Sequence, residues 1–208
     1  MKKCLISAAL TLTVVGAANA APVFFTNAAD PALAGASSID FNSEALGAFT
    51  SRTFDGAVVF SSPQNLFVEN TYSGGYASSG RYVANQANPD PVTISFVSAV
   101  SALGFNWGAA DQPWIIEVFD TSNALLGILN VAAQTSPYAG FIGIDGDGAL
   151  IGSVRLTDQS SYGYDYFLLD NLQYVTGQQN HVSEPAGIAL VGLGLAALGL
   201  SRRRKSGK

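Results

Sequence analysis

The sequence predicts an all-β protein, and three observations support this fold class. Between residues 36 and 175, short apolar runs rich in Val, Ile, Phe and Tyr alternate with clusters of Gly, Pro, Asn, Asp and Ser. Helical spacing of the apolar residues is hard to find in this region. No segment repeats with a period of about 20–50 residues, which argues against a solenoid or a propeller. The pattern therefore predicts a β-sandwich or a barrel.

Ten runs of the sequence are expected to form strands. They are residues 37–42, 57–61, 65–69, 92–97, 102–107, 114–120, 125–131, 140–144, 151–157 and 166–175. In 114–120 the outward set would be Ile115, Glu117 and Phe119, because successive side chains of a strand point to opposite faces. This set is more apolar than a solvated face needs, which hints at a central or concave strand.

The first twenty residues have the pattern of a secretory signal peptide with a short signal helix. Lys2 and Lys3 supply the positive start, residues 5–15 the apolar run, and residues 18–20 the small-residue cleavage pattern. The apolar run is too short to span about 30 Å of hydrocarbon as a membrane anchor. We therefore expect signal peptidase and the secretion machinery to export the chain and to remove residues 1–20.

The other end of the chain predicts a transmembrane helix. Residues 186–201 carry no charge, and the basic tail 202–208 begins with a stop-transfer cluster. The cluster consists of Arg202, Arg203, Arg204 and Lys205. Because basic residues stay cytoplasmic, the body of the protein would face outward. The alternative, a helix buried in the core, is disfavoured because four consecutive cations would flank it.

The residues before this helix resemble the PEP-CTERM sorting signal of exopolysaccharide-producing Gram-negative bacteria. The motif is formed by Val182, Ser183, Glu184 and Pro185, and Ser183 stands where the usual motif has a proline. The resemblance implies that an exosortase, a membrane-embedded cysteine protease-transpeptidase, cuts near Glu184 and Pro185. The protein would then be anchored transiently in the inner membrane and released to the cell envelope or the extracellular matrix.

These segments divide the chain into a signal peptide (1–20), a β-sandwich domain (21–175), a linker (176–182) and the sorting signal (182–208). The β-sandwich domain contains three arginines and no lysine against fourteen carboxylates, a net charge near −11. This charge argues against nucleic acid and other polyanions as partners, because the electrostatic interaction with them would be repulsive. It suits divalent cations, neutral glycans, or simple solubility outside the cell.

The supply of nucleophiles and bases argues against most enzyme classes, and we assign no catalytic residue. The only cysteine, Cys4, lies in the signal peptide, and the only histidine, His181, lies in the linker. Thiol chemistry, a zinc-thiolate site and a Ser-His-Asp triad are therefore not expected. The alternative is a secreted glycan-active hydrolase, which needs only two carboxylates. Its pair would come from Glu44, Glu69 and Glu117.

The segment from Phe167 to Leu172 resembles the closing strand of jelly-roll domains in exported and carbohydrate-binding proteins, often near a calcium site. The resemblance refines the expected fold to a jelly-roll-like β-sandwich, and it is carried onto Asp170 and Asn171 alone. If the two ends of the domain pair, Asp40 could meet Asp170 at a calcium ion, which takes six to eight oxygens. The alternative is that these are turn and strand aspartates without a metal.

Three loops carry aromatic residues that could bind a glycan, because sugars stack on flat rings beside polar groups. The candidates are Tyr72 and Tyr76 in the first loop, Tyr162 and Tyr164 in the second, and Trp107 and Trp114 at the edges of the third. The alternative is that the rings close the ends of the sandwich. The expected function is non-catalytic: binding of glycan, or a structural role, in exopolysaccharide or biofilm.

Overall fold

The computed structural model describes residues 21–87, 91–136, 138–161 and 163–177. The chain divides into a unit of residues 1–177 and a unit of residues 178–208. The predicted signal helix, transmembrane helix and most of the linker lie outside the described residues. In the parts that are described, no helix is both long and apolar enough to cross a membrane.

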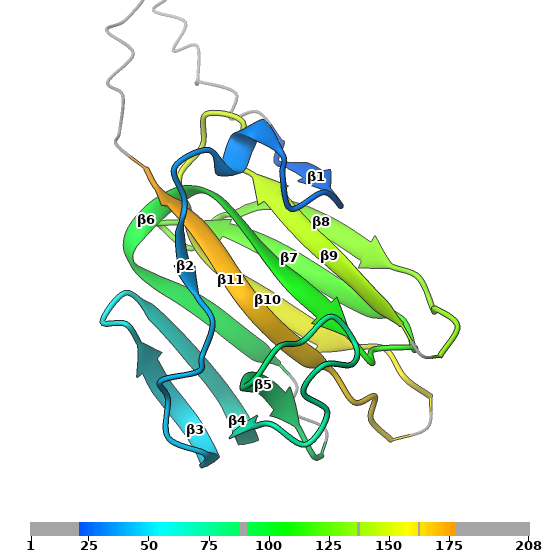
Figure 1. Ribbon diagram of the computed structural model, residues 1–208. Coiled ribbons are helices and arrows are strands. Elements are labelled where there is room, and N and C mark those ends of the chain that lie inside the picture. The colour runs from blue at the N-terminus through cyan, green and yellow to red at the C-terminus, as the bar shows by residue number, and fades with distance from the viewer. Residues whose placement is uncertain (1–20, 88–90, 137, 162, 178–208) are drawn as a thin grey trace, which may run out of the picture. The chain divides into compact units, whose positions relative to one another are not determined.

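Strands make up somewhat more than half of the described residues, and the single helix among those residues is one turn of 3-10 helix. The elements are β1 (Val23–Phe25), η1 (Pro31–Leu33), β2 (Ser37–Ile39), β3 (Gly47–Phe54), β4 (Val58–Glu69), β5 (Tyr82–Asn85), β6 (Val92–Gly108), β7 (Trp114–Asp120), β8 (Leu125–Val131), β9 (Ala139–Asp145), β10 (Ile151–Asp158) and β11 (Leu168–Thr176) (Figure 1). All pairings between these strands are antiparallel.

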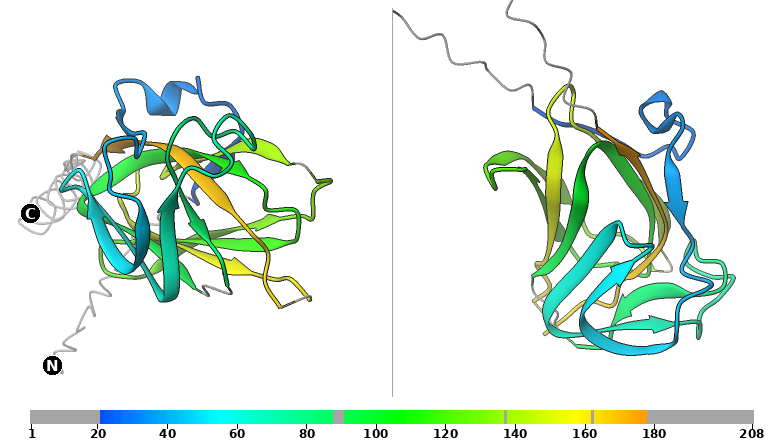
Figure 2. Two further views of the ribbon diagram at one scale, coloured as in Figure 1. Left: turned by 60° about the horizontal axis from the view of Figure 1, so that its bottom comes forward. Right: turned by 90° about the vertical axis from the view of Figure 1, so that its left-hand side faces the viewer.

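The strands form one hydrogen-bonded network that folds over itself into two layers (Figure 2). The long strand β6 joins the layers, because its first part pairs with β4 and β10 and its second part with β9 and β11. One layer runs β3-β4-β6-β10-β7-β8, and the other contains β1, β9, β6, β11 and β2. Strand β5 bridges β4 and β11. This arrangement confirms the predicted all-β sandwich.

The core between the layers is built from large apolar side chains. Its biggest fully buried members are Trp107, Trp114, Phe41, Phe54, Phe60, Phe105 and Phe167. Phe54 and Phe60 meet edge to face at 5.4 Å, one of several such aromatic contacts in the core. Edge-to-face pairs add about 0.5–1.5 kcal/mol beyond the burial of their surface. Because no cysteine follows Cys4 in the sequence, this packing holds the two layers together.

The strands differ from the sequence prediction in two ways that have physical causes. Residues 114–120 and 125–131 match β7 and β8, but the two pairs of predicted strands at 57–69 and 92–107 are each one long strand. In β6 the predicted gap, residues 98–101, lies where the strand changes from pairing with β4 and β10 to pairing with β9 and β11. Strands β1, β3 and β5 were not predicted: β1 and β5 are short, and β3 is mostly exposed, so it lacks a clear apolar alternation.

Candidate functional site

Two of the loops singled out in the sequence meet at one groove of about 400 Å³, which we call the tyrosine groove. Its lining residues are Glu69, Thr71, Tyr72, Gln86, Tyr164 and Tyr166. The first loop connects β4 to β5, and the second connects β10 to β11. The sheet therefore brings together aromatic side chains that lie about ninety residues apart in the sequence.

The rings of the groove differ in how much they face solvent. The side chains of Tyr72 and Tyr164 are 47% and 44% exposed. Tyr76 is half-buried and meets the Tyr72 ring edge to face at 5.7 Å, and Tyr166 meets it at 5.9 Å. Tyr162 lies outside the described residues. The structure therefore leaves two rings free for stacking, and it uses two others to hold Tyr72 in place.

The first loop is held against the sheet by hydrogen bonds along its length. The Ser79 backbone N–H donates to the Asp170 carboxylate of β11 at 2.7 Å. The Asn106 side-chain amide of β6 donates to the Ala77 carbonyl at 2.7 Å. The Tyr72 backbone N–H donates to the Tyr82 hydroxyl at 2.9 Å. These bonds fix the loop before any ligand arrives, which lowers the entropy cost of binding.

The second loop is anchored by Asp165, which directly follows the exposed Tyr164. Its carboxylate accepts hydrogen bonds from the Trp114 indole N–H at 2.8 Å and the Gln112 backbone N–H at 3.0 Å. Its own backbone N–H donates to the Asp158 carboxylate at 2.6 Å. Burial raises the pKa of Asp165, although these donors oppose the increase. The loop that carries Tyr164 is therefore tied to the core.

Polar groups at the base of the tyrosine groove form a chain. The Tyr166 hydroxyl donates to the Glu69 carboxylate, and the Gln86 side-chain amide donates to the same carboxylate at 3.3 Å. Burial, followed by the hydrogen bond with Glu69, raises the pKa of Tyr166 far above its ordinary value. Tyr166 therefore stays protonated at all physiological pH values, and the groove offers both donors and acceptors beside its exposed rings.

The structure corrects the prediction that Trp107 and Trp114 bind glycan. Their side chains are 0% and 1% exposed, and the two rings meet edge to face at 5.3 Å inside the core. Trp107 also stacks on Phe167 at 5.1 Å. Neither indole presents a face to a ligand, because large apolar rings gain more free energy by burial between two sheets than at a loop surface.

Asp40, one of the two predicted calcium ligands, lies within electrostatic reach of the other, Asp170. Asp170 is fully buried, and burial raises its pKa to about 6, with the negative charge of Asp40 adding to the increase. The Ser79 and Asn171 backbone N–H groups donate to its two carboxylate oxygens, each at 2.7 Å. Within the described ranges, no three His, Cys, Asp or Glu side chains gather closely enough to hold a metal.

The raised pKa of Asp170 predicts that the domain loses stability as the pH rises through about 6. The pKa in the folded state is higher than the ordinary aspartate value of 3.8, so protonation favours folding. The contribution, about 2–3 kcal/mol, is complete below pH ~4 and lost above pH ~6. Urea unfolding between pH 4 and 8 in the presence of EDTA measures it, and Asp170→Asn is expected to flatten this part of the profile. A wild-type profile equally flat would contradict the assignment.

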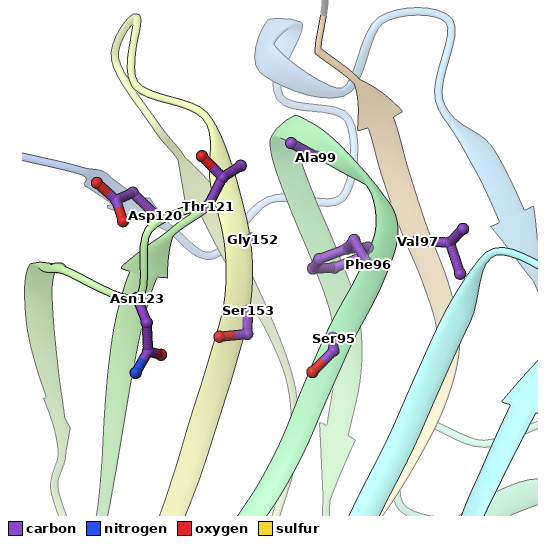
Figure 3. A pocket seen from close by; sticks show the side chains of 9 residues that line it. All are labelled: Ser95, Phe96, Val97, Ala99, Asp120, Thr121, Asn123, Gly152 and Ser153. Carbon is purple, nitrogen blue, oxygen red and sulfur yellow. The ribbon is translucent and has the colours of Figure 1, made fainter.

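A second depression, of about 360 Å³, lies where β6 bends past β10 and the turn between β7 and β8 (Figure 3). Its polar side chains include Ser95, Asn123 and Ser153, and its only ring is Phe96. Phe96 is half-buried, with Tyr174 at 6.1 Å. This depression therefore lacks an exposed aromatic face, and the tyrosine groove is the better candidate for a sugar.

The three carboxylates considered for a hydrolase each interact with different partners. Glu44 pairs with Arg52 and Glu117 with Arg155, both at 2.7 Å. Glu69, in contrast, accepts from the side chains that line the tyrosine groove. Of the three, Glu69 alone lines that groove.

Sequence reasoning missed several residues of the site. Thr71 and Gln86 line the tyrosine groove, and buried Asn85 donates to the Asp165 carbonyl at 2.7 Å and accepts from the Phe167 N–H at 2.8 Å. Asn85 ends β5, a strand that was itself not predicted. No local pattern distinguishes these polar residues from ordinary loop residues, so only the folded chain reveals them.

Comparison with solved structures gives remote matches. A mutant of a carbohydrate-binding module of family 29 is 13% identical and has a TM-score of 0.35; the match covers 72% of this chain and 99% of that chain. The K2 cleaved adhesin domain of Lys-gingipain is also 13% identical, with a TM-score of 0.35 and coverage of 74% and 99%. A glycoside hydrolase family 43 arabinoxylan arabinofuranohydrolase from Bacillus subtilis is 17% identical, with a TM-score of 0.36; the match covers 54% of this chain and only 24% of that chain. At these values the likeness carries no argument about function.

No curated protein matches the chain. One family model matches the C-terminal part of the chain. The PEP-CTERM protein-sorting motif covers residues 181–205, so it begins one residue before the predicted start of the sorting signal. The motif indicates export and sorting to the cell envelope or beyond it, and it implies the secretion machinery and an exosortase as processing partners. The chain thus carries a PEP-CTERM protein-sorting motif, which is consistent with a PEP-CTERM exosortase substrate.

Proposed function

We propose that the β-sandwich binds a neutral glycan in the tyrosine groove and acts, without catalysis, in the exopolysaccharide or biofilm matrix after export. The observation that carries this proposal is the meeting of exposed Tyr72 and Tyr164, from two separate loops, in one groove with polar side chains. Removal of the sorting signal by an exosortase, after transient anchoring in the inner membrane, would release the domain to that matrix.

The chemistry of the groove suits a sugar chain. Sugar rings stack their C–H faces on tyrosine, and the Glu69 carboxylate and Gln86 amide supply hydrogen bonds for hydroxyl groups. The net charge near −11 disfavours an acidic polysaccharide, because like charges repel. The fixed loops favour binding, since little side-chain and backbone freedom remains to be lost.

Replacement of Tyr72 or Tyr164 by alanine is expected to weaken glycan binding about tenfold each, because each removes about 1.4 kcal/mol of stacking. Affinity electrophoresis in gels containing the exopolysaccharide of the producing bacterium measures the effect as a loss of retardation. Leu46→Ala is the matched control, because Leu46 is 51% exposed and does not line the groove. Wild-type protein that migrates equally with and without the polysaccharide would overturn the proposal.

The alternatives give different results in the same system. A purely structural protein would show no retardation, but its deletion would reduce the cohesion of the matrix. A hydrolase would release reducing ends from the polysaccharide, and Glu69→Gln would abolish the release if Glu69 belonged to the carboxylate pair. The ion pairs of Glu44 and Glu117 disfavour these two residues as catalytic groups.

Calcium at Asp40 and Asp170 remains a prediction that a melting experiment tests. If calcium binds only the folded domain, its addition at a hundredfold excess over the dissociation constant adds about 2.7 kcal/mol of stability. We expect a higher melting temperature with calcium than with EDTA, and no such difference in Asp170→Asn. Asp145→Asn, at the end of strand β9, is the matched control. Identical curves for the wild type would remove the metal from the proposal.

A further inference from the structure

The tyrosine groove holds one charged side chain, and no arginine of the described residues neutralises it. Of the residues that line the groove, only Glu69, at the end of β4, is charged. Arg52 and Arg155 each form an ion pair with another glutamate. Arg81 donates to the Glu44 main-chain carbonyl. All three arginines of the β-sandwich domain are thus engaged elsewhere, and the groove keeps a net negative charge.

The Glu69 carboxylate also has acceptor capacity left for a ligand. It accepts hydrogen bonds from the Tyr166 hydroxyl and from the Gln86 side-chain amide, the latter at 3.3 Å. Both donors are uncharged, and two bonds use about half of the roughly four positions at which a carboxylate accepts. Glu69 is half-buried and lines the groove. The carboxylate is therefore held in place by its neighbours without being saturated by them.

An ammonium group is the ligand group that matches this carboxylate best. It carries a positive charge and three N–H donors, and it has no acceptor. The Tyr166 hydroxyl gives its single proton to Glu69, so it offers a ligand an acceptor rather than a donor. Hydrogen bonds between charged partners are about twice as strong as neutral ones. The net charge of the domain, near −11, attracts a cation from a distance as well.

The exposed rings beside Glu69 favour an amino group that is attached to a sugar. Tyr72 and Tyr164, which are 47% and 44% exposed, line the same groove as the carboxylate. The face of a tyrosine ring attracts a cation, and it also stacks against the C–H face of a sugar. A lysine side chain offers the ammonium group without a ring to stack. An amino sugar offers both, so it uses the rings and the carboxylate together.

We propose that the tyrosine groove recognises a free amino group on a sugar unit of an otherwise neutral glycan, with Glu69 as the residue that determines this specificity. The inference rests on the glycan binding proposed above and adds the chemical class of the bound sugar. The ammonium group donates to the Glu69 carboxylate, and the sugar ring stacks on Tyr72 or Tyr164. An N-acetyl group in the same place removes the charge and two of the three N–H donors, so an N-acetylated unit binds more weakly.

Two oligosaccharides that differ only in acetylation test this specificity: the hexamer of glucosamine and the hexamer of N-acetylglucosamine. Titration calorimetry of the purified full chain in mild detergent, at about pH 6 where such amino groups are protonated, measures both affinities. We expect the glucosamine hexamer to bind about tenfold more tightly, and we expect salt to reduce this ratio by screening the charges. Equal affinities, or no binding of the glucosamine hexamer, would overturn the inference.

Glu69→Gln removes the charge but keeps an oxygen that can accept from Tyr166. We expect it to lower the ratio of the two affinities from about tenfold to about twofold. Asp147→Asn is the matched control, because Asp147 is exposed, does not line the groove, and loses the same charge. An unchanged ratio in Glu69→Gln, or an equal fall in Asp147→Asn, would mean that the acidic domain attracts cations in general, and the inference would be wrong.

A hexapeptide of lysine separates the amino group from the sugar. It is expected to bind more weakly than the glucosamine hexamer, and Tyr72→Ala should weaken the hexamer more than the peptide. Equal binding of the two would show that the groove recognises charge alone, which rejects the amino sugar. The proposed function has its own measurement, retardation by the polysaccharide of the producing bacterium. Retardation without a preference for the amino sugar rejects this inference alone, whereas the absence of retardation rejects the proposed function.

Discussion

Replacement of Trp107 by alanine is expected to destabilise the β-sandwich by about 3–5 kcal/mol, the largest effect of any single change considered for this domain. The indole is completely buried, it stacks on Phe167 at 5.1 Å, and it meets Trp114 and Phe105 edge to face. Alanine would leave a cavity between the two layers that the rigid strands cannot close. A domain stable by about 5–15 kcal/mol would lose a large part of its stability.

Trp107→Phe is the matched control, because it keeps a ring in the stack. The Trp107 indole N–H has no hydrogen-bond partner in the described structure, so phenylalanine removes an unsatisfied donor while leaving a smaller cavity. We expect it to cost less than half as much as alanine. Urea unfolding followed by circular dichroism measures both variants. If Trp107→Ala lowers the free energy of unfolding by less than about 1 kcal/mol while glycan binding disappears, the indole contacts the ligand at the surface and its placement in the core is wrong.

Replacement of Asp165 by alanine is expected to destabilise the domain by about 2–4 kcal/mol and to weaken glycan binding as well. The Asp165 carboxylate accepts hydrogen bonds from the Trp114 indole and the Gln112 backbone. Its removal leaves these donors without their acceptor in a buried place, which costs about 1–3 kcal/mol for each such group. Tyr164, the neighbouring residue, would lose its fixed position in the tyrosine groove.

Asp165→Asn distinguishes the contribution of the hydrogen bonds to stability from that of the negative charge. Its amide oxygen can still accept from Trp114, and it carries no charge beside Asp111 and Asp158, whose charges help to raise the pKa of Asp165. Because burial raises this pKa in the folded state, the carboxylate disfavours folding as the pH rises through that pKa. We therefore expect Asp165→Asn to cost much less than alanine at pH 7. Equal losses in both variants would contradict the role of Asp165 as an acceptor.

The local sequence pattern predicted some strands correctly, divided others in two and missed others. Strands β7 and β8 match the predicted ranges because each is a short strand that begins and ends at turn residues. Strands β4 and β6 were each divided in two, since the residues in the middle of each strand, 62–64 and 98–101, interrupt the run of large apolar residues. Strand β3 was missed because most of its residues are exposed, so its sequence shows no clear apolar alternation.

The residues of the candidate site could likewise be predicted only in part. Tyr72 and Tyr164 could be identified from the sequence because tyrosines in Gly- and Ser-rich loops are typical of exposed positions. The same reasoning failed for Trp107 and Trp114, since nothing in the local sequence tells a ring at a loop edge from a ring in the core. The fold decides this, because both indoles lie where the two layers face each other.

The sequence by itself determined the sorting motif, the acidic charge of the domain and its strand class, because these depend on local composition and on the period of apolar residues. Only the tertiary structure decided which tyrosines share a groove and which rings form the core. Those properties depend on contacts between residues far apart in the chain, such as Ser79 with Asp170, and no local pattern encodes them.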